Sequence, residues 1–314
     1  MTGNLTWADL FKRGSCFDLD IHRWYGLVSM KPEDLGLDGE NFEVREALTF
    51  GSERLVSKDS LDAIAKLGNL ARMTVYAAGI PFPLVAGSRF VPADHREELE
   101  GQLLKIKADW DRAVMRFCAN YEKHVNEMRP VLREAIRHAA KTPAAAERAI
   151  ARIEGEVPTV ENVRMRFEMT WRSIRIDVPI DGTETAAKEV SHNVQGALGD
   201  MVVALRKELS DRLAEINALV EKGGRITEKT YNATLKLCER LKQVNFLGDS
   251  ALDAAIEAIK TCIEAARADK DNAAPSLQKG MEAAKKELAV SVEEAVARAA
   301  EKIRGGSLGK RKFT

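Results

Sequence analysis

The sequence predicts a mainly α-helical protein with a small β part, in which a bundle of long helices carries a small sheet-containing head. Three patterns lead to this α+β class. Phe17, Leu19 and Ile21 alternate with polar residues, as in a half-buried strand. Apolar residues recur every three or four positions from Leu99 to Leu132, and alanine-rich helical patterns follow Thr183.

Residues 1–92 are predicted to form the head. Ala47 to Val56 is expected to be a second strand or a hairpin arm. Ser57 is a suitable N-cap for the helix that follows, whose apolar positions continue to Val75. The head is therefore expected to combine two strands with one helix.

A charge-free segment runs from Met73 to Ser88, although 31% of the chain is charged. Pro81 and Pro83 cannot both lie inside a helix, so this segment is predicted to be an extended or turn-like joint. It is either a buried knuckle between two helices or a contact surface for assembly. The second interpretation assigns the contact to four apolar side chains of the joint: Ile80, Phe82, Leu84 and Val85.

Residues 93–145 are predicted to form one long helix, which Pro130 should kink or end near Met128. A connector over 146–182 follows. Within it, the segment from Glu161 to Asp181 fits a short helix that turns into a strand ending at Pro179, although one continuous helical face also fits its apolar residues.

Residues 183–314 are predicted to be an alanine-rich helical region with a basic tail. Asp249 and Ser276 are the expected N-caps of its last two helices. Four helices are expected, over residues 190–220, 227–245, 250–266 and 277–303. Such a succession of amphipathic helices is typical of a bundle.

Composition excludes several classes of protein. The chain has 48 basic and 48 acidic residues, so its overall charge does not indicate binding to nucleic acid or to an anionic membrane. Neither a secretory signal nor a transmembrane segment is predicted, so a cytoplasmic protein is expected. Four widely spaced cysteines predict reduced thiols rather than a disulfide framework: Cys16, Cys118, Cys238 and Cys262.

Several stretches, in this order, resemble a family known only as a domain of unknown function. They are D-L-D-I-H-R-W-Y-G at 18–26, K-P-E-D-L-G-L at 31–37, I-P-F-P at 80–83, S-R-F-V-P at 88–92 and V-R-M-R-F-E at 163–168. Phages, plasmids and integrative elements carry this family, beside genes for a MoxR-type AAA+ ATPase and a von Willebrand A-domain protein. The resemblance implies these two partners and supplies no catalytic residues.

The only candidate metal ligands form a row on one strand face. Asp18, Asp20 and His22 follow at alternate positions, and two carboxylates with an imidazole could bind a divalent cation. A solvated strand face is the favoured interpretation, because no second group of ligands can be placed nearby. The glycine-rich stretch from Gly305 to Arg311 does not match a phosphate loop, so no cofactor is predicted.

Nucleic-acid binding is the alternative function. Arginine with exposed aromatic side chains can hold a single strand by charge and stacking. Seven basic residues are the candidate contacts: Arg164, Arg166, Arg172, Arg175, Lys310, Arg311 and Lys312. Acidic neighbours such as Glu161 and Glu168 offset much of the charge of the first four.

The function predicted first is therefore a non-enzymatic, self-associating scaffold or adaptor of a mobile genetic element. It would form a homo-oligomer or filament and work with the MoxR-type AAA+ ATPase and the von Willebrand A-domain protein. An accessory role in phage or plasmid DNA metabolism is the alternative. No catalytic, cofactor or metal-binding residue is predicted.

Overall fold

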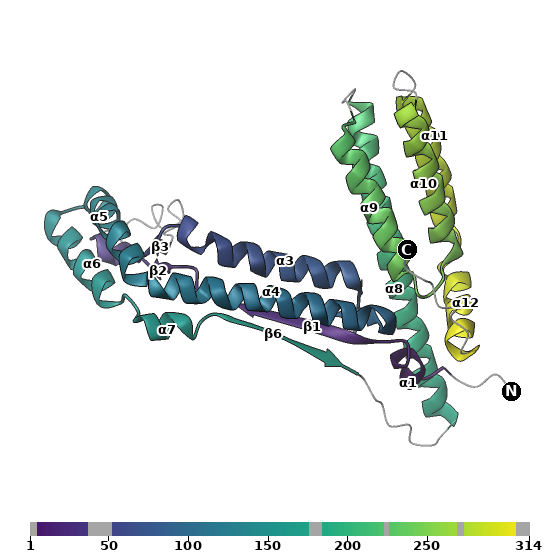
Figure 1. The fold of residues 1–314 in the computed structure, drawn as a ribbon, viewed down its shortest axis with the longest axis horizontal. Coiled ribbons are helices and arrows are strands. Elements are labelled where there is room, and N and C mark those ends of the chain that lie inside the picture. Colours follow the sequence, from purple (N-terminus) through teal and green to yellow (C-terminus); the bar gives the residue numbers. More distant parts are fainter. Residues whose placement is uncertain (1–4, 37–51, 176–183, 223–225, 269–272, 306–314) are drawn as a thin grey trace. The chain divides into compact units, whose positions relative to one another are not determined.

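The structure is a computed structural model, and it describes residues 5–36, 52–175, 184–222, 226–268 and 273–305 (Figure 1). Helices dominate these ranges, with a four-stranded and a two-stranded antiparallel sheet, so the predicted fold class is confirmed. Among the helices of the described ranges, none combines the length and the apolar character needed to cross a lipid bilayer.

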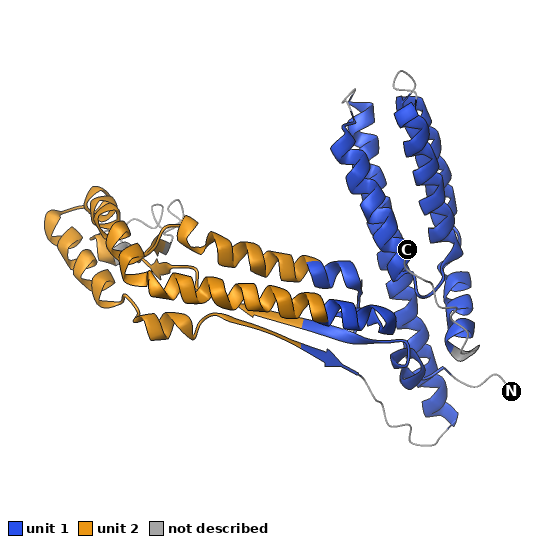
Figure 2. Cartoon of the chain, viewed as in Figure 1, with its two compact units in different colours: residues 1–18, 74–100, 172–314 blue, residues 19–73, 101–171 orange. Residues whose placement is uncertain are grey.

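The chain divides into two compact units (Figure 2). The first unit contains residues 1–18, 74–100 and 172–314, and the second contains residues 19–73 and 101–171. Each unit is therefore assembled from segments that are far apart in the sequence.

The larger sheet has the strand order β4-β5-β1-β6, with bounds Ile80–Pro81, Arg89–Pro92, Gly14–His22 and Glu168–Ile174. β5 pairs antiparallel with β1, so that Cys16 lies opposite Phe90. This confirms the strand predicted from the alternation at Phe17 to Ile21. Helix α1 (Trp7–Phe11) precedes β1 and begins with a capping box between Thr6 and Asp9.

The first unit also contains a helical bundle (Figure 1). Thr227 caps α9 through its side chain, and the Asp249 carboxylate accepts a hydrogen bond from the Ala251 N–H at 3.2 Å at the start of α10. Both predicted helix starts are confirmed. The bundle helices are α8 (Glu184–Glu221), α9 (Glu228–Val244), α10 (Ser250–Ala268), α11 (Ala273–Leu288) and α12 (Val292–Gly305).

The prediction of one terminal helix capped by Ser276 is wrong. Ser276 lies inside α11, because Pro275 occupies the first turn, where a missing N–H costs nothing. The chain then breaks after Leu288, and the Ser291 hydroxyl accepts from the Glu293 N–H at 3.2 Å at the start of α12. Two helices replace the one expected.

Helices α10 and α11 pack closely at one glycine. A Cβ atom at Gly280 would lie 2.1 Å from the Cβ of Cys262, far inside van der Waals contact. Only a residue without a side chain permits this approach. The two helices are accordingly closely packed within the bundle.

The second unit contains the two-stranded sheet of β2 (Leu27–Ser29) and β3 (Ser52–Arg54). An aromatic cluster forms part of its core, with Trp24 against Phe117 and Tyr121 and with Phe167 against Trp110 and Phe117. Its helices are α3 (Asp62–Ala78) and α4 (Ala93–Ala119), each in part, with α5 (Tyr121–Ala139), α6 (Pro143–Gly155) and α7 (Val160–Arg164). Short 3-10 turns at Pro32–Leu35 and Asp59–Leu61 complete it.

The predicted long helix is interrupted at Asn120 and not at Pro130. The Asn120 side-chain amide donates to the Arg116 carbonyl oxygen at 2.8 Å, and this local bond competes with helix continuation. Pro130 lies inside α5. The helix-then-strand interpretation of the following connector is confirmed by α7 and β6, whereas its predicted end at Pro179 lies outside the described residues.

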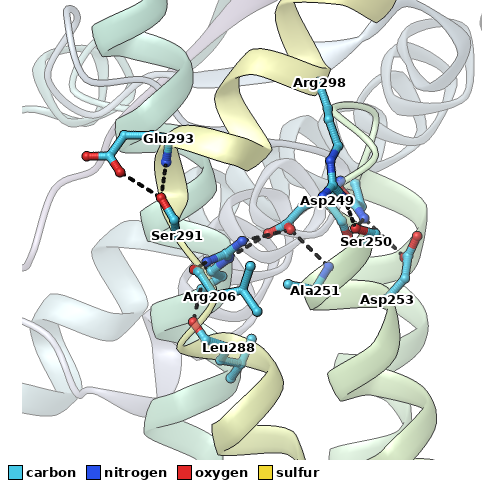
Figure 3. Close-up of polar contacts among 11 residues, drawn as sticks. Arg206, Asp249, Ser250, Ala251, Asp253, Leu288, Ser291, Glu293 and Arg298 are labelled. Carbon is cyan, nitrogen blue, oxygen red and sulfur yellow. Dashed lines mark hydrogen bonds and ion pairs between the residues drawn. The ribbon is translucent and has the colours of Figure 1, made fainter.

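A buried ion pair joins α8 to the residue that precedes α10 (Figure 3). The Arg206 guanidinium donates two hydrogen bonds to the Asp249 carboxylate, at 2.7 and 2.9 Å, and the two side chains are 7% and 2% exposed. Arg206 also donates to the carbonyl oxygens of Leu288 and Val290. Arg206 thus satisfies carbonyl groups that lack an intrahelical partner where the chain breaks between α11 and α12.

Replacing Asp249 is expected to be severely destabilising. Asp249→Ala would leave the Arg206 guanidinium buried without its counter-charge, and we expect a loss of about 3–5 kcal/mol in the free energy of unfolding. Urea titration followed by circular dichroism measures this loss. The control is Glu257→Ala, which removes an exposed ion pair with Lys242 and should cost at most about 1 kcal/mol. Equal losses in the two variants would contradict the prediction.

Candidate functional site

The joint is a short β-ribbon closed by a tight turn. Ile80 pairs with Phe90, and Pro81 pairs with Arg89. The Phe82 N–H donates to the Ser88 carbonyl oxygen at 3.1 Å, which closes the loop at its base. The prediction that the two prolines end the helix is confirmed, since α3 stops at Ala78.

The turn itself is held by further hydrogen bonds. Both the backbone N–H and the hydroxyl of Ser88 donate to the Val85 carbonyl oxygen, at 3.1 and 2.8 Å. Gly87 has a φ of 78°, a left-handed conformation that favours glycine. The backbone from Phe82 to Ser88 is therefore fixed by local bonds.

The inner side of the joint belongs to the core of the first unit. Ile80 is 0% and Phe82 3% exposed, so neither can contact another chain unless the core opens. The Phe82 ring packs against Trp7, with centroids 6.3 Å apart, and against Phe11, at 6.1 Å. Ile80 and Phe82 are therefore buried, as the interpretation of the joint as a buried knuckle between two helices requires.

The outer side of the joint is apolar and exposed. Leu84 is 55% exposed, whereas Val85 packs partly buried against the core. The other exposed side chains of the turn carry no charge. We define the apolar turn by its exposed residues Pro81, Pro83, Leu84 and Ala86. Of the four predicted contact residues, Leu84 is the large side chain on this surface.

A polar network, called the bracing network below, connects the joint to helices α8 and α9. The Tyr76 hydroxyl donates to the Glu208 carboxylate, which also pairs with Arg240. The guanidinium groups of Arg89 and Arg240 lie 4.2 and 4.6 Å from the centroid of the Tyr76 ring, close enough for cation–π attraction. Arg89 donates from Nε to the Gly79 carbonyl oxygen at 2.9 Å. Burial, followed by the nearby Arg240, lowers the pKa of Arg89 to about 10.

The side chains of the candidate metal row on β1 contact a neighbouring arginine and one another. Asp18 pairs with Arg172 at 2.9 Å, and Asp20 lies 3.0 Å from the His22 ring nitrogen. Asp20 and His22 are exposed. Among the described residues, no group of three potential ligands is placed to hold a metal ion. The row thus contains one ion pair, between Asp18 and Arg172, and one hydrogen bond, between Asp20 and His22.

The predicted nucleic-acid residues are exposed where the structure describes them. This holds for Arg164 and Arg166 in the second unit, and for Arg172 and Arg175 in the first. Arg172 is already paired with Asp18. The three basic residues of the tail, Lys310, Arg311 and Lys312, lie outside the described residues.

One of the two aromatic residues beside these arginines is packed inside the second unit. Phe167 packs edge-on against Trp110 and Phe117, with centroids 6.5 and 5.9 Å apart. Trp171 is half-buried. Phe167 is therefore packed against two neighbouring rings, whereas Trp171 keeps part of its surface exposed.

A family model described as a protein of unknown function, DUF3150, matches residues 12–285. The chain belongs to the DUF3150 family. The match covers most of the chain, which confirms the resemblance to a domain of unknown function. No curated protein and no solved structure matches this chain. The partners and the mobile-element setting implied by the resemblance stay predictions.

Sequence reasoning missed the bracing network of this DUF3150 protein. Tyr76 and Glu208 are 132 positions apart, and no local pattern connects them. The absence of charge in the joint showed only that its residues are apolar. The approach of two arginines to the Tyr76 ring required the fold.

Removing the Tyr76 hydroxyl tests whether the bracing network stabilises the fold. Tyr76→Phe keeps the ring in contact with the two guanidinium groups but deletes the hydrogen bond to Glu208. We expect a loss of about 1–2 kcal/mol in the free energy of unfolding. Tyr25→Phe is the matched control, because Tyr25 is 55% exposed, and it should change stability by less than about 0.5 kcal/mol. Urea titration of both variants measures these changes in stability. An unfolding midpoint of Tyr76→Phe equal to that of the wild type would contradict a stabilising role for the network.

The four cysteines of the DUF3150 chain are free thiols. Burial raises the pKa of Cys16 to about 12 and, as the largest cause, the pKa values of Cys238 and Cys262 to about 11. Cys118 is only half-buried, and burial raises its pKa as well. Because the thiolate is the reactive form, none of the buried thiols is suited to nucleophilic chemistry near pH 7.

Thiol labelling checks this arrangement. At pH 8, Ellman's reagent should modify Cys118 first, while the other three thiols react only after urea unfolds the chain. Cys118→Ser should abolish the early reaction and leave the later one intact. Rapid labelling of Cys16 in the native protein would contradict its burial.

Proposed function

We propose that this DUF3150 chain is a non-enzymatic scaffold or adaptor that self-associates through the apolar turn. The observation that supports this proposal is the exposure of Leu84 on a turn with a fixed backbone. Single exposed leucines are common on protein surfaces. This one stands out because Pro81, Pro83 and Ala86 surround it with further uncharged surface.

A rigid apolar turn is well suited to contact another chain. Fully burying one leucine side chain contributes about 1.5–3 kcal/mol. A fixed backbone reduces the conformational entropy that is lost on binding, so more of this energy appears as affinity. In a two-fold symmetric dimer each chain contributes the same turn, which doubles the apolar area removed from water.

The adaptor part of the proposal rests on the family resemblance. The proposed partners are a MoxR-type AAA+ ATPase and a von Willebrand A-domain protein, in the cytoplasm of a bacterium that carries the mobile element. ATP hydrolysis by the partner ATPase would then change the assembly state of the DUF3150 chain. Nucleic-acid binding has less support, because Phe167 is packed against Trp110 and Phe117 and does not form a stacking platform.

Charging the apolar turn tests self-association. We expect Leu84→Asp to remain folded, since Leu84 is exposed, and to shift the protein from oligomer to monomer at micromolar concentration. Light scattering coupled to size-exclusion chromatography measures the mass. Leu219→Asp is the matched control, because Leu219 is an exposed leucine on α8, and it should leave the oligomer unchanged.

Phe82→Asp provides the contrasting variant. It places a charge in the aromatic core, and we expect it to unfold the first unit rather than to release folded monomers. A wild-type protein that is monomeric at all tested concentrations, with or without the proposed partners, would overturn the self-association proposal. An oligomer that survives Leu84→Asp would overturn the assignment to the apolar turn.

A further inference from the structure

The second unit contains a small pocket beside the sheet of β2 and β3. Its volume is about 200 Å³. Four largely apolar side chains line its floor: Trp24, Leu61, Ile64 and Phe167. Typical small-molecule sites are larger, about 300–1,000 Å³. This pocket has room for one large side chain.

Three basic side chains line the same pocket: Arg23, Arg54 and Lys58. The pairing of β2 with β3 sets Arg54 opposite Leu27, so a cation and an apolar residue lie side by side at the pocket. Among the described residues, none of the three cations has a carboxylate partner. The pocket's own carboxylate, Asp62, is paired with Lys66 at 2.7 Å. Within the described residues, the pocket lining therefore holds more positive than negative side chains.

Arg23 adds a second indication of a ligand. Its guanidinium lies 4.7 Å from the centroid of the Tyr25 ring, and Tyr25 is 55% exposed. The Nε atom of Arg23 is buried and has no hydrogen-bond partner in the described part of the chain. Buried polar groups normally have a partner, so this donor is an unmet hydrogen bond on a residue that lines the pocket.

We propose that this pocket docks a short acidic peptide segment of a partner protein that carries one large apolar side chain. The apolar side chain would fill the floor between Trp24 and Ile64. Flanking carboxylates would pair with Arg54 and Lys58, and a carboxylate or carbonyl oxygen would accept from Arg23. This docking is independent of the proposed self-association, because all of its residues belong to the second unit.

The chemistry of the floor favours an apolar side chain over a nucleobase. A base inserted into the pocket would bring polar edges into contact with Trp24, Ile64 and Phe167. Each such group left without a hydrogen bond costs on the order of 1–3 kcal/mol. An aliphatic or phenyl side chain carries no such cost. Single-stranded nucleic acid is accordingly the rival that the experiment must distinguish.

Fluorescence anisotropy on the full chain tests the proposal. The probe is a fluorescein-labelled peptide, Glu-Asp-Phe-Asp-Glu, in low-salt buffer. We expect saturable binding that weakens at least about tenfold when the two rim cations are neutralised in Arg54→Gln/Lys58→Gln. A peptide with alanine in place of phenylalanine should weaken by a similar factor, because the floor then stays empty.

Matched controls separate the pocket from general charge attraction. Arg112→Gln/Lys123→Gln removes two exposed positive charges of the second unit that do not line the pocket, and binding should change by less than about twofold. Ala65→Trp introduces a bulky ring at the pocket wall and should abolish binding while circular dichroism shows a folded protein.

Two results would overturn the proposal. One is peptide binding that is the same in the wild type and in Arg54→Gln/Lys58→Gln. The other is the absence of peptide binding while an oligothymidylate probe binds and is lost in that same variant, which would assign the pocket to nucleic acid. The oligomer mass is measured on the same samples. Because it reports on self-association alone, a failure of the docking proposal can be told apart from a failure of the self-association proposal.

Discussion

The first unit depends on the packing of one ring, Phe90, which is 0% exposed. Phe90 contacts Phe11 from the N-terminal helix, Phe82 from the joint and Phe246 from the loop after α9, with ring centroids 5.1 to 6.1 Å apart. A Cβ atom at Gly14 would lie 2.6 Å from this ring, so β1 can pair with β5 only because position 14 is glycine. Three distant parts of the chain therefore share one apolar core, and the joint is fixed by that core.

Local rules predicted much of the fold. The helical stripes, the helix start at Thr227, the cap at Asp249 and the strand at Phe17 to Ile21 depend on neighbours a few positions away, which the sequence displays. The break after Leu288 had no local signal, and the side chain that bonds its carbonyl oxygen, Arg206, is 82 positions earlier. The break at Asn120 has a local signal, the amide side chain, whereas Pro130, the stronger helix breaker in the sequence, lies inside α5.

The functional surfaces were predictable only in part. The absence of charge in the joint identified an apolar segment, yet composition could not separate the buried Phe82 from the exposed Leu84 two residues later. That separation follows from the hydrogen bonds that fold the turn. The pocket in the second unit had no sequence signal, because Arg23, Arg54 and Phe167 come from separate segments and converge only in three dimensions.

The segmented first unit also constrains how the chain is made. Trp7 and Phe11 belong to a core completed by Phe246, so the ribosome must add more than two hundred residues before this core can close. At synthesis rates of about 5–20 residues per second, the interval is roughly 10–50 s. Throughout it the N-terminal aromatic residues lack their final partners, whereas all residues of the second unit emerge earlier. The nascent chain thus presents an apolar N-terminal segment that chaperones can bind before the protein is complete.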